Sequence, residues 1–190
     1  MEPIRIAEEI EKKFPCSVLG ICEHKGQVSV VVDRSDIVAM CQFLKSGHKM
    51  NHLNCLCGVD NLTRKGKYIE RFEVIYQLYS IENHISLRLK AQIRDSAHPI
   101  IDSITSLWTG ADWLERETYD LVGIMFNNHP NLKRILTPED WQGHPLRKDY
   151  VLRGDTEWQG LEELKEKSRK LRRFDFHSAH VKQGAASDDD

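Results

Sequence analysis

The fold is decided by residues 72–93, which read FEVIYQLYSIENHISLRLKAQI. Phe72, Val74, Tyr76 and Leu78 stand at every second position, and apolar side chains alternate with polar ones from Ile85 to Ile93. A period of two is typical of β-strands that bury one face. Only a short turn-like segment containing Glu82-Asn83 separates the two runs. The stretch therefore predicts two strands that pair antiparallel.

Upstream of this pair, the same alternation occurs at Leu53, Cys55, Cys57 and Val59 and predicts a third strand, with both cysteines facing the core. Two β-rich runs at 17–22 and 27–32 surround a Gly-containing turn and predict a hairpin. Apolar residues at helical spacing predict a helix over 6–14, ended by Pro15. They predict a second helix over 37–44, capped by Asp33 or Ser35 and stopped by Gly47.

Downstream, helical spacing is present over residues 100–108 and again over 111–121, where Gly123 predicts the helix end. Residues 127–160 are rich in Pro, Gly and charge and show no sustained period. A final helix is expected over 160–174. We therefore expect an α+β domain at 1–126, with a mixed or antiparallel sheet and helices on one side. An extended partner-binding arm with a helix follows at 127–174, and a disordered acidic tail at 175–190.

The overall composition excludes several classes of function. The chain has 27 basic and 29 acidic residues, a net charge of −2, so no global field attracts nucleic acid or an anionic membrane. No apolar run approaches the roughly 20 residues that span a bilayer. The five cysteines form an odd set without a regular framework, which favours a reducing, cytosol-like compartment.

Recognisable catalytic and metal-binding motifs are missing from the sequence. Fe–S clusters typically use Cys-x2-Cys spacings, so Cys55-x-Cys57 is interpreted as structural. The pairs His48/His52 and His177/His180 each lack a third ligand. Nucleophile elbows and phosphate-binding loops are also missing. One alternative from a different class stays open, an autonomous metal-dependent hydrolase that uses His129, His144 and nearby carboxylates.

Polar and aromatic residues are dense between 113 and 150. Enrichment in Trp, Tyr and Arg is typical of protein–protein interface anchors. We therefore expect a partner interface here, and we expect Arg147, Lys148 and Asp149 to pair with charges on the partner. The residues of this expected interface are Trp113, Glu115, Arg116, Glu117, Asp120, His129, Arg134, Trp141, Arg147, Lys148, Asp149 and Tyr150.

The same segment resembles a known family, the 30 kDa subunit (designated C) of NADH:quinone oxidoreductase, which is respiratory complex I. The resemblance rests on several motifs spread over about residues 50–150. They are Gly58-Val59-Asp60, Arg71-Phe72-Glu73-Val74, Leu87-Arg88-Leu89-Lys90, Glu115-Arg116-Glu117, Asp120, Gly123-Ile124, His129-Pro130, Arg134-Ile135-Leu136, and the block from Asp140-Trp141 through Leu146-Arg147-Lys148-Asp149-Tyr150.

The resemblance implies a non-catalytic structural subunit of the peripheral arm, with no catalytic residue, cofactor or metal in this chain. FMN and Fe–S clusters would then belong to partner subunits, which pass electrons from NADH to quinone coupled to proton translocation. It also implies docking chiefly on the quinone-site subunit (designated D), with the subunits designated B and I as further partners. The chain would lie at the cytoplasmic face of the cell membrane, associated only through the complex. An equivalent subunit of a membrane-bound hydrogenase or of a ferredoxin- or F420-dependent complex is the related alternative.

Overall fold

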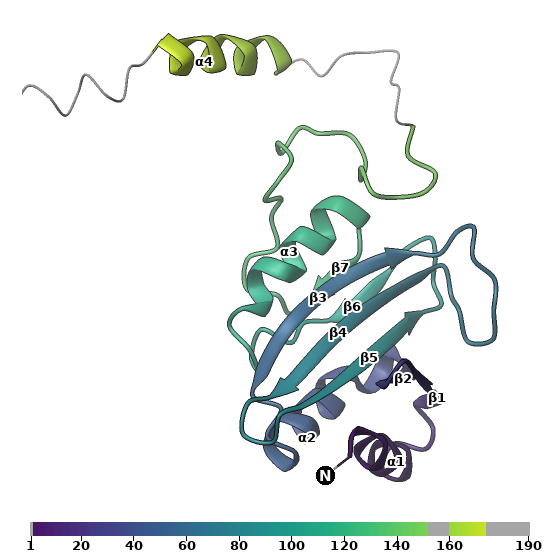
Figure 1. The fold of residues 1–190 in the computed structure, drawn as a ribbon. Coiled ribbons are helices and arrows are strands. Elements are labelled where there is room, and N and C mark those ends of the chain that lie inside the picture. The colour runs from purple at the N-terminus through teal and green to yellow at the C-terminus, as the bar shows by residue number, and fades with distance from the viewer. Residues whose placement is uncertain (1, 152–159, 174–190) are drawn as a thin grey trace, which may run out of the picture. The chain divides into compact units, whose positions relative to one another are not determined.

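In the computed structural model, which describes residues 2–151 and 160–173, the alternating stretches form one five-stranded sheet. The strand order is β1-β2-β5-β4-β3 (Figure 1). As predicted, β4 and β5 pair antiparallel along their whole length, with Phe72 opposite Ile93 and Ser80 opposite Ile85. Because β2 pairs parallel with β5, the sheet is mixed. The strands are β1 (Val18–His24), β2 (Gln27–Asp33), β3 (His52–Asp60), β4 (Phe72–Ser80) and β5 (Ile85–Ile93).

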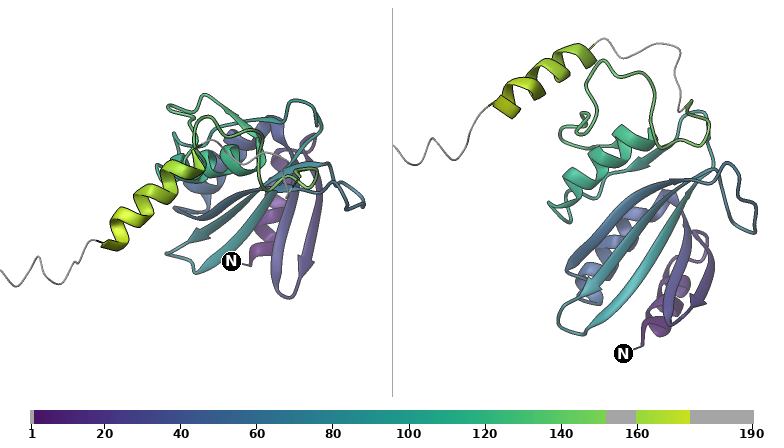
Figure 2. Two further views of the ribbon diagram at one scale, coloured as in Figure 1. Left: turned by 90° about the horizontal axis from the view of Figure 1, so that it is seen from above. Right: turned by 45° about the horizontal axis from the view of Figure 1, so that its top comes forward.

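Two helices, α1 (Pro3–Lys13) and α2 (Ile37–Gly47), cover one face of this sheet (Figure 2). Their apolar residues, among them Ile6, Ile10 and Leu44, are buried with the even-numbered positions of β4 and the odd-numbered positions of β5. A 3-10 turn, η1 (Arg34–Asp36), precedes α2, and the Asp33 carboxylate accepts the N–H of Ser35 there. Both predicted helices are therefore confirmed.

The cysteines of β3 do not face the core, so this prediction was wrong. A β-bulge between Leu53 and Cys55 shifts the register, and Leu56 takes the buried position opposite Tyr76. Cys55 pairs with Gln77 on the opposite face and is exposed, and Cys57 is half-buried. One extra residue in a strand exchanges the two faces of all residues beyond it, and this change cannot be detected from alternation alone.

Residues 100–108 do not form the predicted helix. Ile100–Asp102 is instead strand β6, which pairs parallel with β7 (Met125–Asn127), and the next residues form turns. The helix predicted over 111–121 is present as α3 (Ala111–Val122), which lies alongside β3 (Figure 1). Gly123 ends α3 in the left-handed conformation at φ 78°, as expected.

The expected boundary after residue 126 differs from the one in the structure. The chain divides into two compact units, Met1–Tyr150 and Val151–Asp190, so residues 127–150 belong to the first unit. The second unit contains α4 (Leu161–Arg173), close to the expected final helix. The tail at 175–190 and the pair His177/His180 lie outside the described residues. In the part of the chain that the structure describes, no helix is long and apolar enough to cross a membrane.

Candidate partner interface

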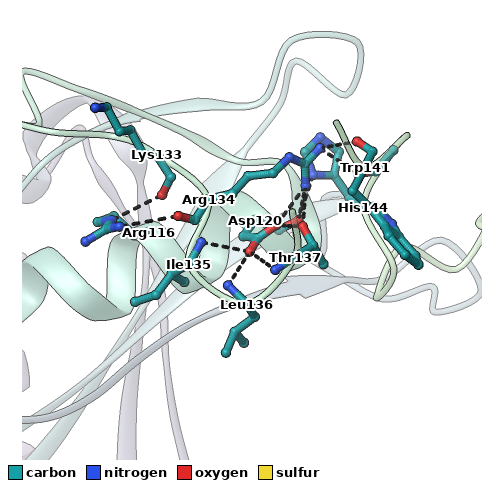
Figure 3. A network of polar contacts seen from close by, with 10 residues as sticks. Arg116, Asp120, Lys133, Arg134, Ile135, Leu136, Thr137, Trp141 and His144 are labelled. Carbon is teal, nitrogen blue, oxygen red and sulfur yellow. Dashed lines mark hydrogen bonds and ion pairs between the residues drawn. The ribbon is translucent and has the colours of Figure 1, made fainter. Parts of the chain in front are cut away.

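The centre of the polar segment is Asp120, a fully buried residue in the last turn of α3. One carboxylate oxygen accepts the backbone N–H groups of Ile135, Leu136 and Thr137 at 3.0, 2.7 and 2.8 Å. The other oxygen accepts the Arg134 guanidinium at 2.7 Å and the Thr137 hydroxyl (Figure 3). The carboxylate therefore organises a segment that has little apolar burial of its own.

The ionised state of Asp120 is strongly favoured. Burial by itself would raise the pKa of this carboxyl, but the hydrogen bonds from Thr137, the Ile135 N–H and Arg134 outweigh it and hold the pKa well below its usual range. A buried carboxylate is tolerated in proteins when it is paired and its lone pairs are satisfied. Both conditions are met here.

Two arginines hold the backbone of residues 133–143. Arg134 donates to the carbonyls of Trp141 and Gly143 at 3.1 and 2.9 Å, in addition to its ion pair with Asp120. Arg116 on α3 donates to the carbonyls of Lys133 and Arg134 at 3.1 and 3.3 Å (Figure 3). The segment is therefore attached to α3 by hydrogen bonds that arginine side chains make to carbonyl groups.

Arg147, which the sequence analysis expected to pair with a charge on a partner, makes its described contacts within the first unit. Its Nε donates to the Val122 carbonyl at 2.7 Å, and one of its two terminal nitrogens, Nη2, donates to the Gly123 carbonyl at 3.2 Å. Its guanidinium also lies 5.1 Å from the ring centroid of buried Phe72. The last carbonyls of a helix have no partner within the helix and carry partial negative charge, so a cation there is favourable. Arg147 caps α3 from within the domain.

His144 approaches the same end of α3, with Nδ1 2.9 Å from the Asp120 carbonyl. Burial lowers the pKa of His144, and the positive charges of Arg147 and Arg134 lower it further. The bond to the Asp120 carbonyl opposes this shift. A neutral ring with its proton on Nδ1 satisfies this contact, because a carbonyl oxygen can only accept.

The residues beside Arg147 are attached to the end of β3. The buried Asp60 carboxylate accepts the Lys148 N–H at 2.9 Å and is 3.4 Å from the Arg71 guanidinium. Arg71 in turn pairs with Asp149 at 2.5 Å, and this bond lowers the pKa of Asp149. The backbone of Lys148 and the carboxylate of Asp149 are thus used inside the first unit, while the Lys148 side chain is exposed.

The side chain of His129 is fully buried and faces two carboxylates of α3, Asp112 at 3.1 Å and Glu115 at 3.9 Å from its Nε2. Its Nδ1 accepts the N–H of Asn131 at 3.0 Å, which places the ring proton on Nε2. A protonated nitrogen has no lone pair for a metal ion. Within the described ranges, no group of three or more His, Cys, Asp or Glu residues could hold a metal, and the hydrolase alternative has no site there.

The outward-facing residues differ from those that form the internal network. Trp113 is 59% exposed, and the Arg116 guanidinium lies 5.1 Å from its ring centroid. Glu117 is also exposed, while Trp141 and Tyr150 are half-buried. Two exposed residues were missed by the sequence analysis, Leu136 at 62% and Leu146 at 57%. Isolated leucines in an aperiodic segment give no signal that distinguishes an exposed side chain from a buried one.

Comparison with known families gives a match over most of the chain. The family described as "Respiratory-chain NADH dehydrogenase, 30 Kd subunit" matches residues 30–156. A Geobacter metallireducens protein, named as the subunit designated C of NADH-quinone oxidoreductase, is 48% identical over 153 residues, which are 80% of this chain and 92% of that protein. The Hyphomonas neptunium protein of the same name is 37% identical over 183 residues, 91% of this chain and 87% of that protein.

Two solved structures are similar to the fold. The trypsin-resistant fragment (1-134) of Nqo5 has a TM-score of 0.61 and 30% identity, and the match covers 70% of this chain and all of that fragment. A chain of a membrane-bound sulfane sulfur reductase, an archaeal respiratory membrane complex, also has a TM-score of 0.61 and covers 92% of this chain and 96% of that one. Its identity is 19%, so this second similarity shows the fold alone.

Proposed function

The chain belongs to the 30 kDa subunit family of the respiratory-chain NADH dehydrogenase. On this basis we propose that it is a non-catalytic subunit in the peripheral arm of a proton-translocating NADH:quinone oxidoreductase. In this proposal it docks on the quinone-site subunit (designated D). Electrons pass from NADH through FMN and Fe–S clusters in other subunits to quinone, and this chain positions those subunits. The subunits designated B and I are further partners in this proposal. The complex holds the chain at the cytoplasmic face of the cell membrane.

The observation that supports a docking role is the distribution of exposed hydrophobic side chains. In the described part of the first unit, four large hydrophobic residues are more than half exposed, and three of them lie on α3 or in the segment after it. Single exposed leucines are common on proteins, but an exposed Trp held by an Arg is typical of interface anchors. The four residues are Ile81, Trp113, Leu136 and Leu146.

The polar residues of the same segment support the proposal in another way. Asp120, Arg134 and Arg147 use their charges inside the first unit, so the backbone that carries Leu136 and Leu146 is fixed before a partner binds. A surface that is already ordered loses less conformational entropy on binding than a flexible one. We therefore assign the contact to Trp113, Leu136 and Leu146 and the rigidity of the contact surface to the buried charges.

Substitution of the outward-facing tryptophan tests this assignment. Trp113→Ala should weaken binding of the full chain to the quinone-site subunit by about 2 kcal/mol or more, as truncation of a central anchor does. The thermal unfolding midpoint of the free chain should change little, because the side chain is 59% exposed. Binding is measured by titration calorimetry with the purified quinone-site subunit of the same organism.

Ile81→Ala is the matched control, since Ile81 is 55% exposed but lies in the turn between β4 and β5. It should bind the quinone-site subunit with the affinity of the wild type. Equal affinities for all three proteins would contradict the assignment of the contact surface. Failure of the wild-type chain to bind the quinone-site subunit at all would contradict the docking proposal itself.

A further inference from the structure

In the first half of α3, the contact with the segment after β7 contains two acidic side chains that have no Lys or Arg partner among the described residues. Asp112 and Glu115 stand three residues apart on α3 and both face His129. Within residues 2–151 and 160–173, neither carboxylate makes an ion pair with a lysine or an arginine. The side chains of Glu115 and His129 are completely buried.

Hydrogen bonding leaves two carboxylate oxygens without a donor, Oε2 of Glu115 and Oδ1 of Asp112. Glu115 Oε1 accepts the N–H of Ile104 at 2.8 Å, whereas its Oε2 is buried and has no hydrogen-bond partner. The ring of His129 has one N–H, on Nε2, because the Asn131 N–H donates to Nδ1. That Nε2 lies nearer to Asp112, 3.3 Å from its carbonyl and 3.1 Å from its carboxylate. A single N–H cannot compensate both carboxylates, and of the two side chains that of Glu115 is completely buried whereas that of Asp112 is 32% exposed.

The other elements around Glu115 add no positive charge. Helix α2 contributes the buried thiol of Cys41, and strand β4 contributes the buried hydroxyl of Tyr76, which has no hydrogen-bond partner. The segment after β6 contributes the Ser103 hydroxyl and the Ile104 amide. A buried carboxyl surrounded by neutral groups and a second acid is more stable when it is protonated.

We propose that Glu115, Asp112 and His129 form a buried proton-binding site in which Glu115 carries a proton at mildly acidic to neutral pH, and that loss of this proton at higher pH weakens the contact between α3 and the segment after β7. The proton neutralises Glu115 and so removes one of the two negative charges. When the proton leaves, the single N–H of His129 lies nearer to Asp112 than to Glu115. The released charge therefore remains uncompensated.

The titration behaviour of Glu115 agrees with this geometry. The pKa of this carboxyl is raised from 4.5 to about 7, mainly by burial and further by the negative charge of Asp112. The hydrogen bonds from Ser103 and the Ile104 N–H oppose the shift. Because the folded pKa lies above the unfolded one, the folded state binds more protons between these values. Stability should therefore fall as the pH rises from about 4.5 to about 7 and level off above.

The test compares the full wild-type chain with Glu115→Gln and with Glu117→Gln as the matched control. Glu117 is on the same helix but is exposed, so the control removes the same charge without burial. As the pH rises from about 5 to about 8, the unfolding midpoint of Glu115→Gln should rise relative to that of the wild type, because only the wild type loses a proton at this position. The difference for Glu117→Gln should stay constant. Parallel pH profiles for all three proteins would overturn the proposal.

Infrared spectroscopy provides a direct reading that does not depend on stability. The carbonyl band of a protonated carboxylic acid should be stronger in the wild-type chain than in Glu115→Gln at about pH 6, and this excess should have disappeared at about pH 8, because ordinary carboxyl groups contribute equally to both proteins. If Glu115→Gln does not fold, Asp112→Asn replaces it. Removing that charge should move the loss of the band to lower pH, because Asp112 raises the pKa of Glu115. A wild-type chain without the excess, or an unchanged midpoint in Asp112→Asn, would disprove the site.

Discussion

The ion pair between Asp120 and Arg134 takes the place of the apolar core that residues 133–143 lack. Asp120 accepts three backbone N–H groups of that segment, and Arg134 donates to two of its carbonyls. The two side chains also bind each other. Such a network stabilises only while all its members are satisfied, because a buried charge without its partner is costly. The sequence analysis identified both residues, but it assigned them to a partner interface because it could not show which charges meet.

The pH dependence of this network is a prediction at the residue scale. Asp120→Asn should destabilise the free chain by about 3–5 kcal/mol at neutral pH, since Arg134 then has no counter-ion. Because the pKa of Asp120 is lowered in the fold, its contribution is complete above the unfolded value of 3.8 and is lost as the pH falls below it. Urea unfolding at a series of pH values should therefore show the variant and the wild type converging in acid. A constant difference down to about pH 2 would exclude an ionised Asp120 as the cause.

Among the helices and strands, the strongest periodicities predicted the structure best. The strands β4 and β5 and the helices α1 and α2 were predicted because each buries one regular face against the sheet. Strand β6 was missed because its pairing partner, β7, is more than twenty residues away and is itself three residues long. The bulge in β3 was missed because the residues around it alternate as an unbroken strand would. Tertiary pairing decided both cases.

The end of α3 allows a prediction at the scale of one element. Gly123 and Gly26 both have positive φ, 78° and 73°, so alanine at either position costs about 1–2 kcal/mol in backbone strain. A methyl group at Gly26 would meet open space, whereas at Gly123 it would clash with the ring of His144 and the guanidinium of Arg147. Gly123→Ala should therefore lose an additional amount of about 1–3 kcal/mol from overpacking. Chemical denaturation measures both variants, and equal losses would show that the packing of His144 and Arg147 against Gly123 is unimportant.

At the scale of the whole chain, the boundary of the first unit follows from charge pairing. Aperiodic sequence suggested that the domain ends at residue 126, because conformational entropy opposes the ordering of a segment that buries little apolar surface. The structure extends the unit to Tyr150, and the contacts of Asp120, Arg147 and Asp60 supply what the apolar surface does not. Each contact joins residues far apart in sequence. Periodicity therefore gave no indication of this boundary.

Two truncated chains test this boundary. A chain that ends at Tyr150 should unfold cooperatively with a midpoint close to that of the first unit in the full chain, because every contact of Asp120 and Arg147 is retained. A chain that ends at Leu132 should be much less stable, since it lacks Arg134 and the three N–H donors and leaves the Asp120 carboxylate unpaired in the last turn of α3, where the helix dipole disfavours a negative charge. Adding Asp120→Asn to the shorter chain should recover part of the loss, although the same substitution harms the full chain. Circular dichroism melting curves measure all four proteins. If the shorter chain were as stable as the longer one, residues 133–150 would contribute nothing to the first unit, and Asp120 would not be the residue that holds them.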